Sequence, residues 1–116
     1  KYHARFEDNL WRYMNALTAI VQEQMPWVSS ERILSAAMYS LAIQNLMNIC
    51  RAPGLSSAGR RKRMRTFLRQ DEVAQHLSSM KYYTSGLGQS LKLLLLTSRS
   101  VFLLEKLIAV RLGGVS

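Results

Sequence analysis

Residues 30–50, SERILSAAMYSLAIQNLMNIC, decide the fold of this chain. On a helical projection their apolar side chains fall on two different sides: Ile33, Leu34, Ala37 and Leu41 on one, and Ala36, Ile43, Met47 and Cys50 on the other. A helix that is apolar nearly all round is a buried helix, because a surface helix keeps a polar face. The stretch also contains small residues, which let neighbouring helices approach closely. We therefore expect a central helix from Ser30 to Cys50.

The same stretch holds the longest charge-free run of the chain, the 18 residues from Ile33 to Cys50. Its polar side chains are Ser35, Tyr39, Ser40, Gln44, Asn45 and Asn48. A membrane-spanning helix needs about 20 predominantly apolar residues, and these polar groups would need partners inside lipid. The other apolar region, 91–112, is interrupted by five charges: Lys92, Arg99, Glu105, Lys106 and Arg111. We expect no transmembrane span.

A first helix is expected over residues 4–24, where apolar side chains recur at three- and four-residue steps: Phe6, Leu10, Met14, Leu17 and Val21. The acids Glu7 and Asp8 suit its first turn because they complement the helix dipole. Pro26 ends this helix, since the residue before a proline is pushed out of the helical region. Ser29 is the expected N-cap of the central helix.

The central helix is expected to end at Arg51-Ala-Pro-Gly. The residues LSSAG at 55–59, which follow, predict a mobile loop. A third helix is expected from about Arg60. Its apolar set shifts beyond Gln70, so we expect a kink or short break near Asp71. A last helix should run over 89–112 and end at the glycines at 113–114.

The sequence thus predicts one all-α domain over 1–116, a compact bundle of four main helices. Residues 1–50 form a helical hairpin, 51–70 a basic loop and the start of the third helix, and 71–116 a C-terminal helical hairpin. The opening residues KYHARFEDNL have no apolar signal core, so the chain looks like a mature or trimmed product. An intracellular, nuclear or virion-associated location is the most compatible.

Charge is concentrated between the two apolar halves. The chain has 16 basic and 7 acidic residues, a net charge of +9, and its 51–69 stretch carries seven of the bases and no acid. Such a dense local charge repels itself unless an anion is supplied. A merely solvated charged face is the plain alternative, and GRRKRMR at 59–65 is also compatible with nuclear localisation.

No enzyme signature accompanies this charge. His3 and His76 lack metal-ligand spacing, and Cys50 falls on an apolar helix face. Asp71 and Glu72 are adjacent, so on a helix they point in different directions and do not converge as an acid–base pair. We expect no catalytic residues, no cofactor and no metal.

Anion binding is the site that the pattern favours. Arg61, Arg65 and Arg69 are four residues apart, which places their guanidinium forks about 6 Å apart on one helix face. That spacing suits the phosphates of one nucleic-acid strand, with DNA and RNA both open. Tyr82 and Tyr83 are the only nearby aromatic pair, so little sequence specificity is expected. The candidate anion-binding residues are Arg60, Arg61, Lys62, Arg63, Arg65, Arg69, Lys92, Arg99 and Lys106.

The last helix is more apolar than a surface helix needs to be, which predicts a homo-oligomer or a larger complex. The candidate interface residues are Leu96, Leu103, Leu104, Leu107 and Ile108. The preferred function is a non-enzymatic, structural nucleic-acid-binding assembly protein of the nucleoprotein, coat or ribonucleoprotein-subunit type. The alternative is a helical subunit or adaptor of a large organellar or membrane-associated complex, in which the basic patch meets acidic protein or a peripheral anionic membrane.

Overall fold

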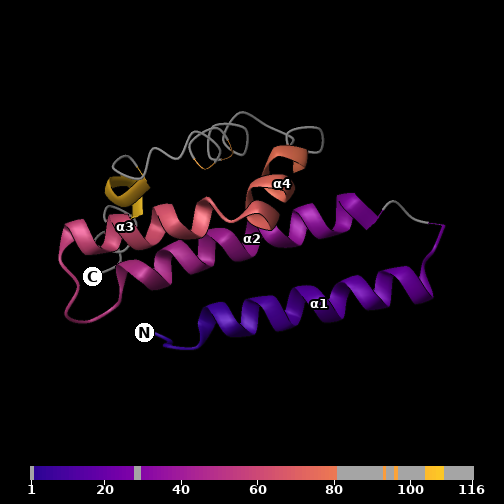
Figure 1. Cartoon of the computed structure of the whole chain (residues 1–116), viewed down its shortest axis with the longest axis horizontal. Helices are drawn as coiled ribbons and strands as arrows, with labels where there is room; N and C mark the ends of the chain where they lie inside the picture. Colours follow the sequence, from indigo (N-terminus) through magenta and orange to yellow (C-terminus); the bar gives the residue numbers. More distant parts are fainter. Residues whose placement is uncertain (1, 28–29, 81–92, 94–95, 97–103, 109–116) are drawn as a thin grey trace.

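The chain folds as a bundle of α-helices, as expected (Figure 1). The computed structural model describes residues 2–27, 30–80, 93, 96 and 104–108. Its elements are α1 (Phe6–Gln24), α2 (Ser30–Cys50), α3 (Ser57–Leu68) and α4 (Asp71–Met80). Leu93, Leu96 and residues 104–108 are also helical and belong to the predicted last helix, whose other residues lie outside the described part. Within the described residues there is no β-strand.

Helix α2 is the central helix, as its composition predicted. It lies between α1 on one side and α3 and α4 on the other, and it contacts all three (Figure 1). Met38 and Ala42, at its middle, have no exposed surface. By length and composition alone α2 could also cross a membrane, but half of the qualifying window is buried inside the fold. Core helices of globular proteins commonly have these properties as well.

Helix α1 packs against α2 through the apolar positions that predicted it. Leu10, Met14 and Val21 are buried, and the helix ends at Gln24, just before Pro26. It begins at Phe6 and not at Ala4, because residues 4 and 5 form a turn before it. The arm before this turn is tied to α2 by two hydrogen bonds. The backbone N–H of His3 donates to Asn48 Oδ1 at 2.7 Å, and Asn48 Nδ2 donates to the His3 carbonyl at 2.9 Å.

Helix α3 begins three residues earlier than the sequence predicted. The hydroxyl of Ser56 accepts a hydrogen bond from the backbone N–H of Gly59 at 3.1 Å, which makes Ser56 the N-cap. The expected loop over 55–59 is therefore wrong for Ser57–Gly59, which form the first turn of the helix. The preceding turn is completed by Gly54, whose φ of 78° is the left-handed conformation that glycine adopts most easily.

The predicted break near Asp71 is confirmed. Helix α3 ends at Leu68, and α4 starts at Asp71. On α3 the buried side chains are Met64, Phe67 and Leu68, and on α4 they are Val73, Leu77 and Met80. A continuous helix would carry these two sets around to different sides, so the break lets each set face the core.

The described residues of the last helix also belong to this core. Leu93, Leu96, Leu104 and Ile108 lie in the same buried cluster as the side chains of α1 to α4. The expectation that Leu96, Leu104 and Ile108 line an interface is therefore wrong, because the chain's own helices cover them. Of the predicted interface set Leu107 is exposed, at 53%, and Leu103 lies outside the described residues.

Asn48 provides a test of how the N-terminal arm is held. We expect Asn48→Ala to lower the free energy of unfolding by about 1–3 kcal/mol, since it removes two hydrogen bonds and leaves the two His3 backbone groups unpaired. Gln44→Ala on the same helix is the control, because Gln44 is exposed and, among the described residues, its amide donates only to Ser40 Oγ. Denaturant melts followed by circular dichroism give both values. Equal stability of the two variants would contradict the role given to Asn48.

Candidate nucleic-acid interface

The buried side of α3 fixes which of its basic residues reach solvent. Because Met64, Phe67 and Leu68 face the core, the side chains opposite them point outward. At about 100° per residue, Lys62, Arg65 and Arg69 fall within about 60° of arc on the outer side, and they extend about 10 Å along the helix axis. All three are exposed. We call these three residues the basic strip; Arg63, also exposed, lies on the other flank of the helix.

The basic strip has no counter-charge in the described part of the chain. Among those residues, no carboxylate lies within 4 Å of Lys62, Arg65 or Arg69. Like charges three and four residues apart on a helix repel one another. Helix α3 also lacks an acid in its first turn, where the helix dipole favours negative charge. An anion bound along the strip would relieve this repulsion.

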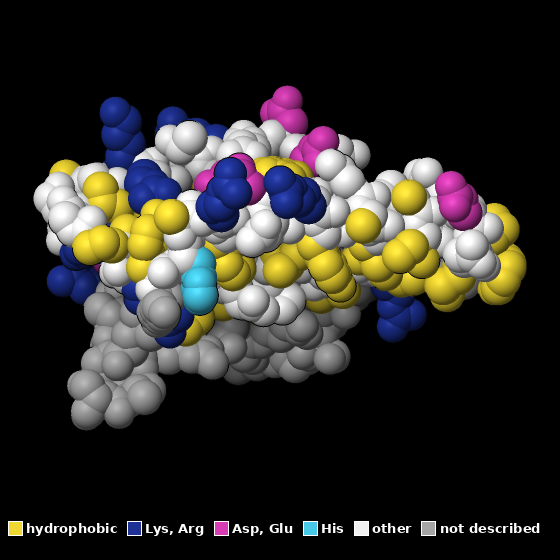
Figure 2. Space-filling view, turned by 90° about the horizontal axis from the view of Figure 1, so that it is seen from below, with side chains coloured by type: hydrophobic (Ala, Val, Ile, Leu, Met, Phe, Trp, Pro, Cys, Tyr) yellow, Lys and Arg dark blue, Asp and Glu magenta, His cyan; other side chains and the backbone are white. Residues whose placement is uncertain are grey.

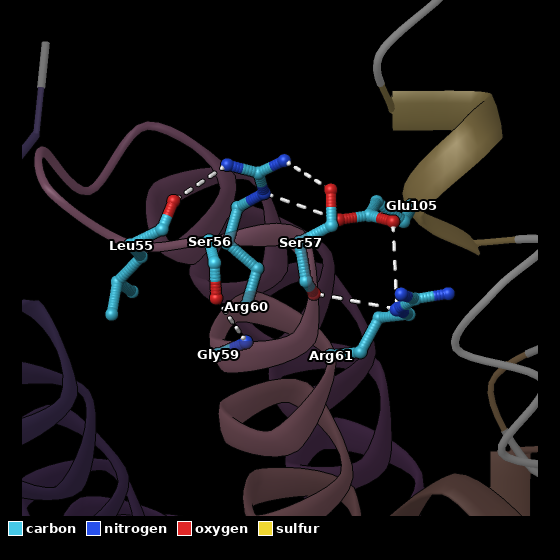
Figure 3. A network of polar contacts seen from close by, with 7 residues as sticks. All are labelled: Leu55, Ser56, Ser57, Gly59, Arg60, Arg61 and Glu105. Carbon is cyan, nitrogen blue, oxygen red and sulfur yellow. Dashed lines mark hydrogen bonds and ion pairs between the residues drawn. The ribbon is translucent and has the colours of Figure 1, made fainter.

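Arg60 has a different environment, which Figure 3 shows. Its Nε donates to Glu105 Oε2 at 3.1 Å, Nη1 to the Leu55 carbonyl at 3.0 Å, and Nη2 to Ser57 Oγ at 3.0 Å. All three nitrogens of this guanidinium are therefore engaged. Arg60 holds together the turn before α3, the first turn of α3 and the helical segment 104–108.

Arg61 lies on the other side of the same carboxylate (Figure 3). Its Nε donates to the Ser57 carbonyl at 3.3 Å and lies 3.9 Å from Glu105 Oε1. Glu105 itself is only 8% exposed, so this charge is taken out of water in contact with two arginines. We call Arg60, Arg61 and Glu105 the Glu105 clamp.

The structure thus divides the nine predicted anion-binding residues. Arg60 and Arg61 are in the Glu105 clamp, whereas Lys62, Arg63, Arg65 and Arg69 face solvent. Lys106 is exposed next to the clamp, and Lys92 and Arg99 lie outside the described residues. Sequence reasoning treated Glu105 only as an interruption of an apolar helix. A signal was available, because Glu105 is the only acid after Glu72 in a chain with an excess of bases.

A surface hollow of about 340 Å³ lies at the junction of α3 and α4, lined by Trp11, Gln70, Asp71 and Glu72. Gln70 Nε2 also donates to Glu7 Oε1 at 3.0 Å. Two exposed carboxylates line this hollow, and they would repel a phosphate. This hollow is therefore unsuited to an anion, whereas the outer side of α3 presents exposed bases.

The environment of Cys50 does not favour a reactive thiolate. Cys50 is half-buried, and burial raises the pKa of its thiol; the Glu105 carboxylate raises this pKa further, while Arg60 lowers it. A thiol with a raised pKa is a poor nucleophile at neutral pH. In the described part of the chain, no three His, Cys, Asp or Glu side chains come close enough together to hold a metal ion.

No protein-family model matches the chain, and neither a curated protein nor a solved structure is significantly similar to it.

The Glu105 clamp is expected to contribute to stability. Glu105→Ala removes a charged hydrogen bond and leaves Arg60 Nε without that partner, so we expect a loss of about 1.5–3 kcal/mol in the free energy of unfolding. Leu107→Ala, an exposed position on the same helical segment, should stay within about 0.5 kcal/mol of wild type. Denaturant melts of the two variants measure this difference. A Glu105→Ala protein as stable as Leu107→Ala would contradict the clamp.

The reactivity of Cys50 is a second test of the same region. Because burial raises the pKa of its thiol, alkylation by iodoacetamide should reach its half-maximal rate at a higher pH in the folded protein than in the chain unfolded in guanidinium. The unfolded chain is the internal control, since it has the same single cysteine. A folded-state midpoint at or below that of the unfolded chain would disprove the buried environment.

Proposed function

We propose that the protein binds the phosphate backbone of a nucleic acid through the basic strip and acts as a non-catalytic structural component of a nucleoprotein assembly. The observation that supports this is the division of charge on and around α3. One buried acid, Glu105, meets Arg60 and Arg61, while Lys62, Arg65 and Arg69 are left exposed together with no carboxylate beside them in the described residues. Three exposed bases on one side of a helix give a local positive field that attracts an anion.

The chemistry of the strip suits phosphate. A guanidinium group presents a planar fork of N–H donors that matches phosphate oxygens, and a lysine ammonium adds a mobile point charge. Four-residue steps on a helix are about 6 Å long, so Arg65 and Arg69 can contact neighbouring phosphates of one strand. The short reach of the strip, about 10 Å, limits one copy to a few phosphates.

Base recognition is not part of this proposal. The only aromatic residue of α3 is Phe67, which is 1% exposed and belongs to the core. Without an exposed aromatic side chain on α3, bases have no stacking partner there. Contacts to phosphate position a protein on nucleic acid without reading its sequence, so binding should be largely sequence-independent.

An acidic protein segment or an anionic lipid surface would meet the same charges. Polyglutamate and vesicles containing phosphatidylserine are therefore the comparison ligands for every binding assay. Nucleic acid is favoured because its phosphates are held at a regular spacing near that of the arginines. Tighter binding to polyglutamate or to vesicles than to nucleic acid at equal salt would reject the proposal.

The salt dependence of binding tests the strip directly. Affinity for a labelled duplex should fall steeply with salt, and Arg65→Gln/Arg69→Gln should make the slope of log K against log salt shallower by about 1.8, or two phosphate contacts. The charge-matched control is Arg32→Gln/Arg51→Gln, which removes the same charge from two exposed residues outside the strip. It should keep most of the slope. Equal slopes for the two double variants, or binding insensitive to salt, would refute the proposed contact.

A further inference from the structure

Helix α1 has a second apolar side that the fold does not use. The described residues include four large hydrophobic side chains that are more than half exposed, and three of them lie on α1 or in the turn after it. Tyr13 and Ile20 are each 54% exposed, and Trp27 is 78% exposed. Figure 2, which looks from the α1 side, shows hydrophobic side chains gathered over the half of the molecule where α1 ends. A different side of α1, with Leu10, Met14 and Val21, already packs in the core.

The exposed residues follow the spacing of a helix–helix seam. Asn9, Tyr13, Ala16, Ile20 and Glu23 are separated by four, three, four and three residues, and all five are exposed. This alternation keeps residues along one line of a helix that packs against another helix. Ala16, at the centre, is small enough for close approach of a second backbone. We call these five residues the outer seam.

We propose that the outer seam binds the outer seam of a second copy of this chain, with the two α1 helices antiparallel around a twofold axis at Ala16. A twofold interface uses the same surface on both copies, so that surface must be complementary to itself. With the axis at Ala16, each Ala16 faces its counterpart, and Tyr13 of one copy lies beside Ile20 of the other. Large side chains then flank a small centre, which lets the helices approach closely.

The charges along α1 decide the antiparallel direction. In this register Glu23 of the second copy lies opposite Asn9, between Arg5 and Arg12, each about one helical turn away. Arg5, Arg12 and Glu23 are exposed and form no ion pair within the described part of the chain. A parallel pair would place each of these charges against its like. Trp27, beyond Glu23, would come to the Arg5 end of the second copy, where an aromatic ring favours a cation.

A second copy fits this surface better than a membrane does. A helix that lies on a membrane carries mainly lysine and arginine beside its apolar side, whereas Asp8 and Glu23 are exposed on α1. The pairing is independent of the proposed phosphate binding. Helices α1 and α3 lie on opposite sides of α2 (Figure 1), so the outer seam and the basic strip are separate surfaces.

The mass of the protein in solution tests the pairing, measured without nucleic acid in high salt. Wild type should sediment at twice 13.3 kDa at tens of micromolar. Ile20→Glu should be monomeric with an unchanged melting curve, because Ile20 is exposed in a single copy but would be buried against Tyr13 of the second copy, where a carboxylate has no partner. Leu107→Glu, at the other strongly exposed aliphatic side chain of the described residues, should remain dimeric. A monomeric wild type, or an Ile20→Glu protein that stays dimeric, overturns the inference and leaves phosphate binding to be judged by its own salt slope.

Cross-linking tests the direction of the pair. In a Cys50→Ser background, Ala16→Cys should cross-link to itself with a short bismaleimide. Asn9→Cys and Glu23→Cys should each cross-link poorly alone and efficiently when the two proteins are mixed. Efficient self-cross-linking of Asn9→Cys would show a parallel pair and overturn the proposed geometry.

Discussion

The fold depends on covering α2 on most of its circumference. Its core positions Met38, Ala42, Leu46 and Ile49 are almost fully buried, and α1 cannot cover them alone. Two short helices, α3 and α4, supply the other cover. Their separation by the break after Leu68 follows from the same requirement, because one straight helix could not turn both of their apolar sets toward α2.

The free energy gained by this apolar burial also has to offset the cost of burying polar groups of α2. Ser35 Oγ and Asn45 Nδ2 are buried without a hydrogen-bond partner among the described residues. Each unpaired group costs about 1–3 kcal/mol, which one fully buried large apolar side chain offsets. By contrast, Asn48 is buried and paired, and it fixes the N-terminal arm on α2. A buried polar residue of α2 therefore stabilises the fold where it is paired, as Asn48 is, and destabilises it where it is unpaired, as Ser35 and Asn45 are.

The sequence predicted those features that depend on local pattern. The bounds of α2, the end of α1 before Pro26 and the break near Asp71 follow from hydrophobic spacing and from proline. The start of α3 was missed because Ser56, Ser57 and Gly59 have the composition of a loop, while the Ser56 side chain caps a helix.

Leu96, Leu104 and Ile108 were assigned to an interface because periodicity shows that a helix face is apolar but not which chain covers it. For the same reason the exposure of Tyr13 and Ile20 could not be read from the pattern. The division between paired and open arginines depends on a contact 45 residues away, from Arg60 to Glu105.

Charge and assembly are connected through the size of the basic strip. Lys62, Arg65 and Arg69 can neutralise only about three phosphates, and three such contacts give weak binding at physiological salt. Two copies joined through α1 would present two strips on one rigid body. If both strips reached one nucleic acid, the second would bind at a raised local concentration, and the combined affinity would exceed that of either strip without any new contact. The Glu105 clamp contributes to the same end, because it fixes α3 at its first turn and thereby fixes the direction of the strip relative to the core. A short basic helix on such a paired scaffold would therefore suit the proposed role, since a structural nucleoprotein component makes many weak, sequence-independent contacts together.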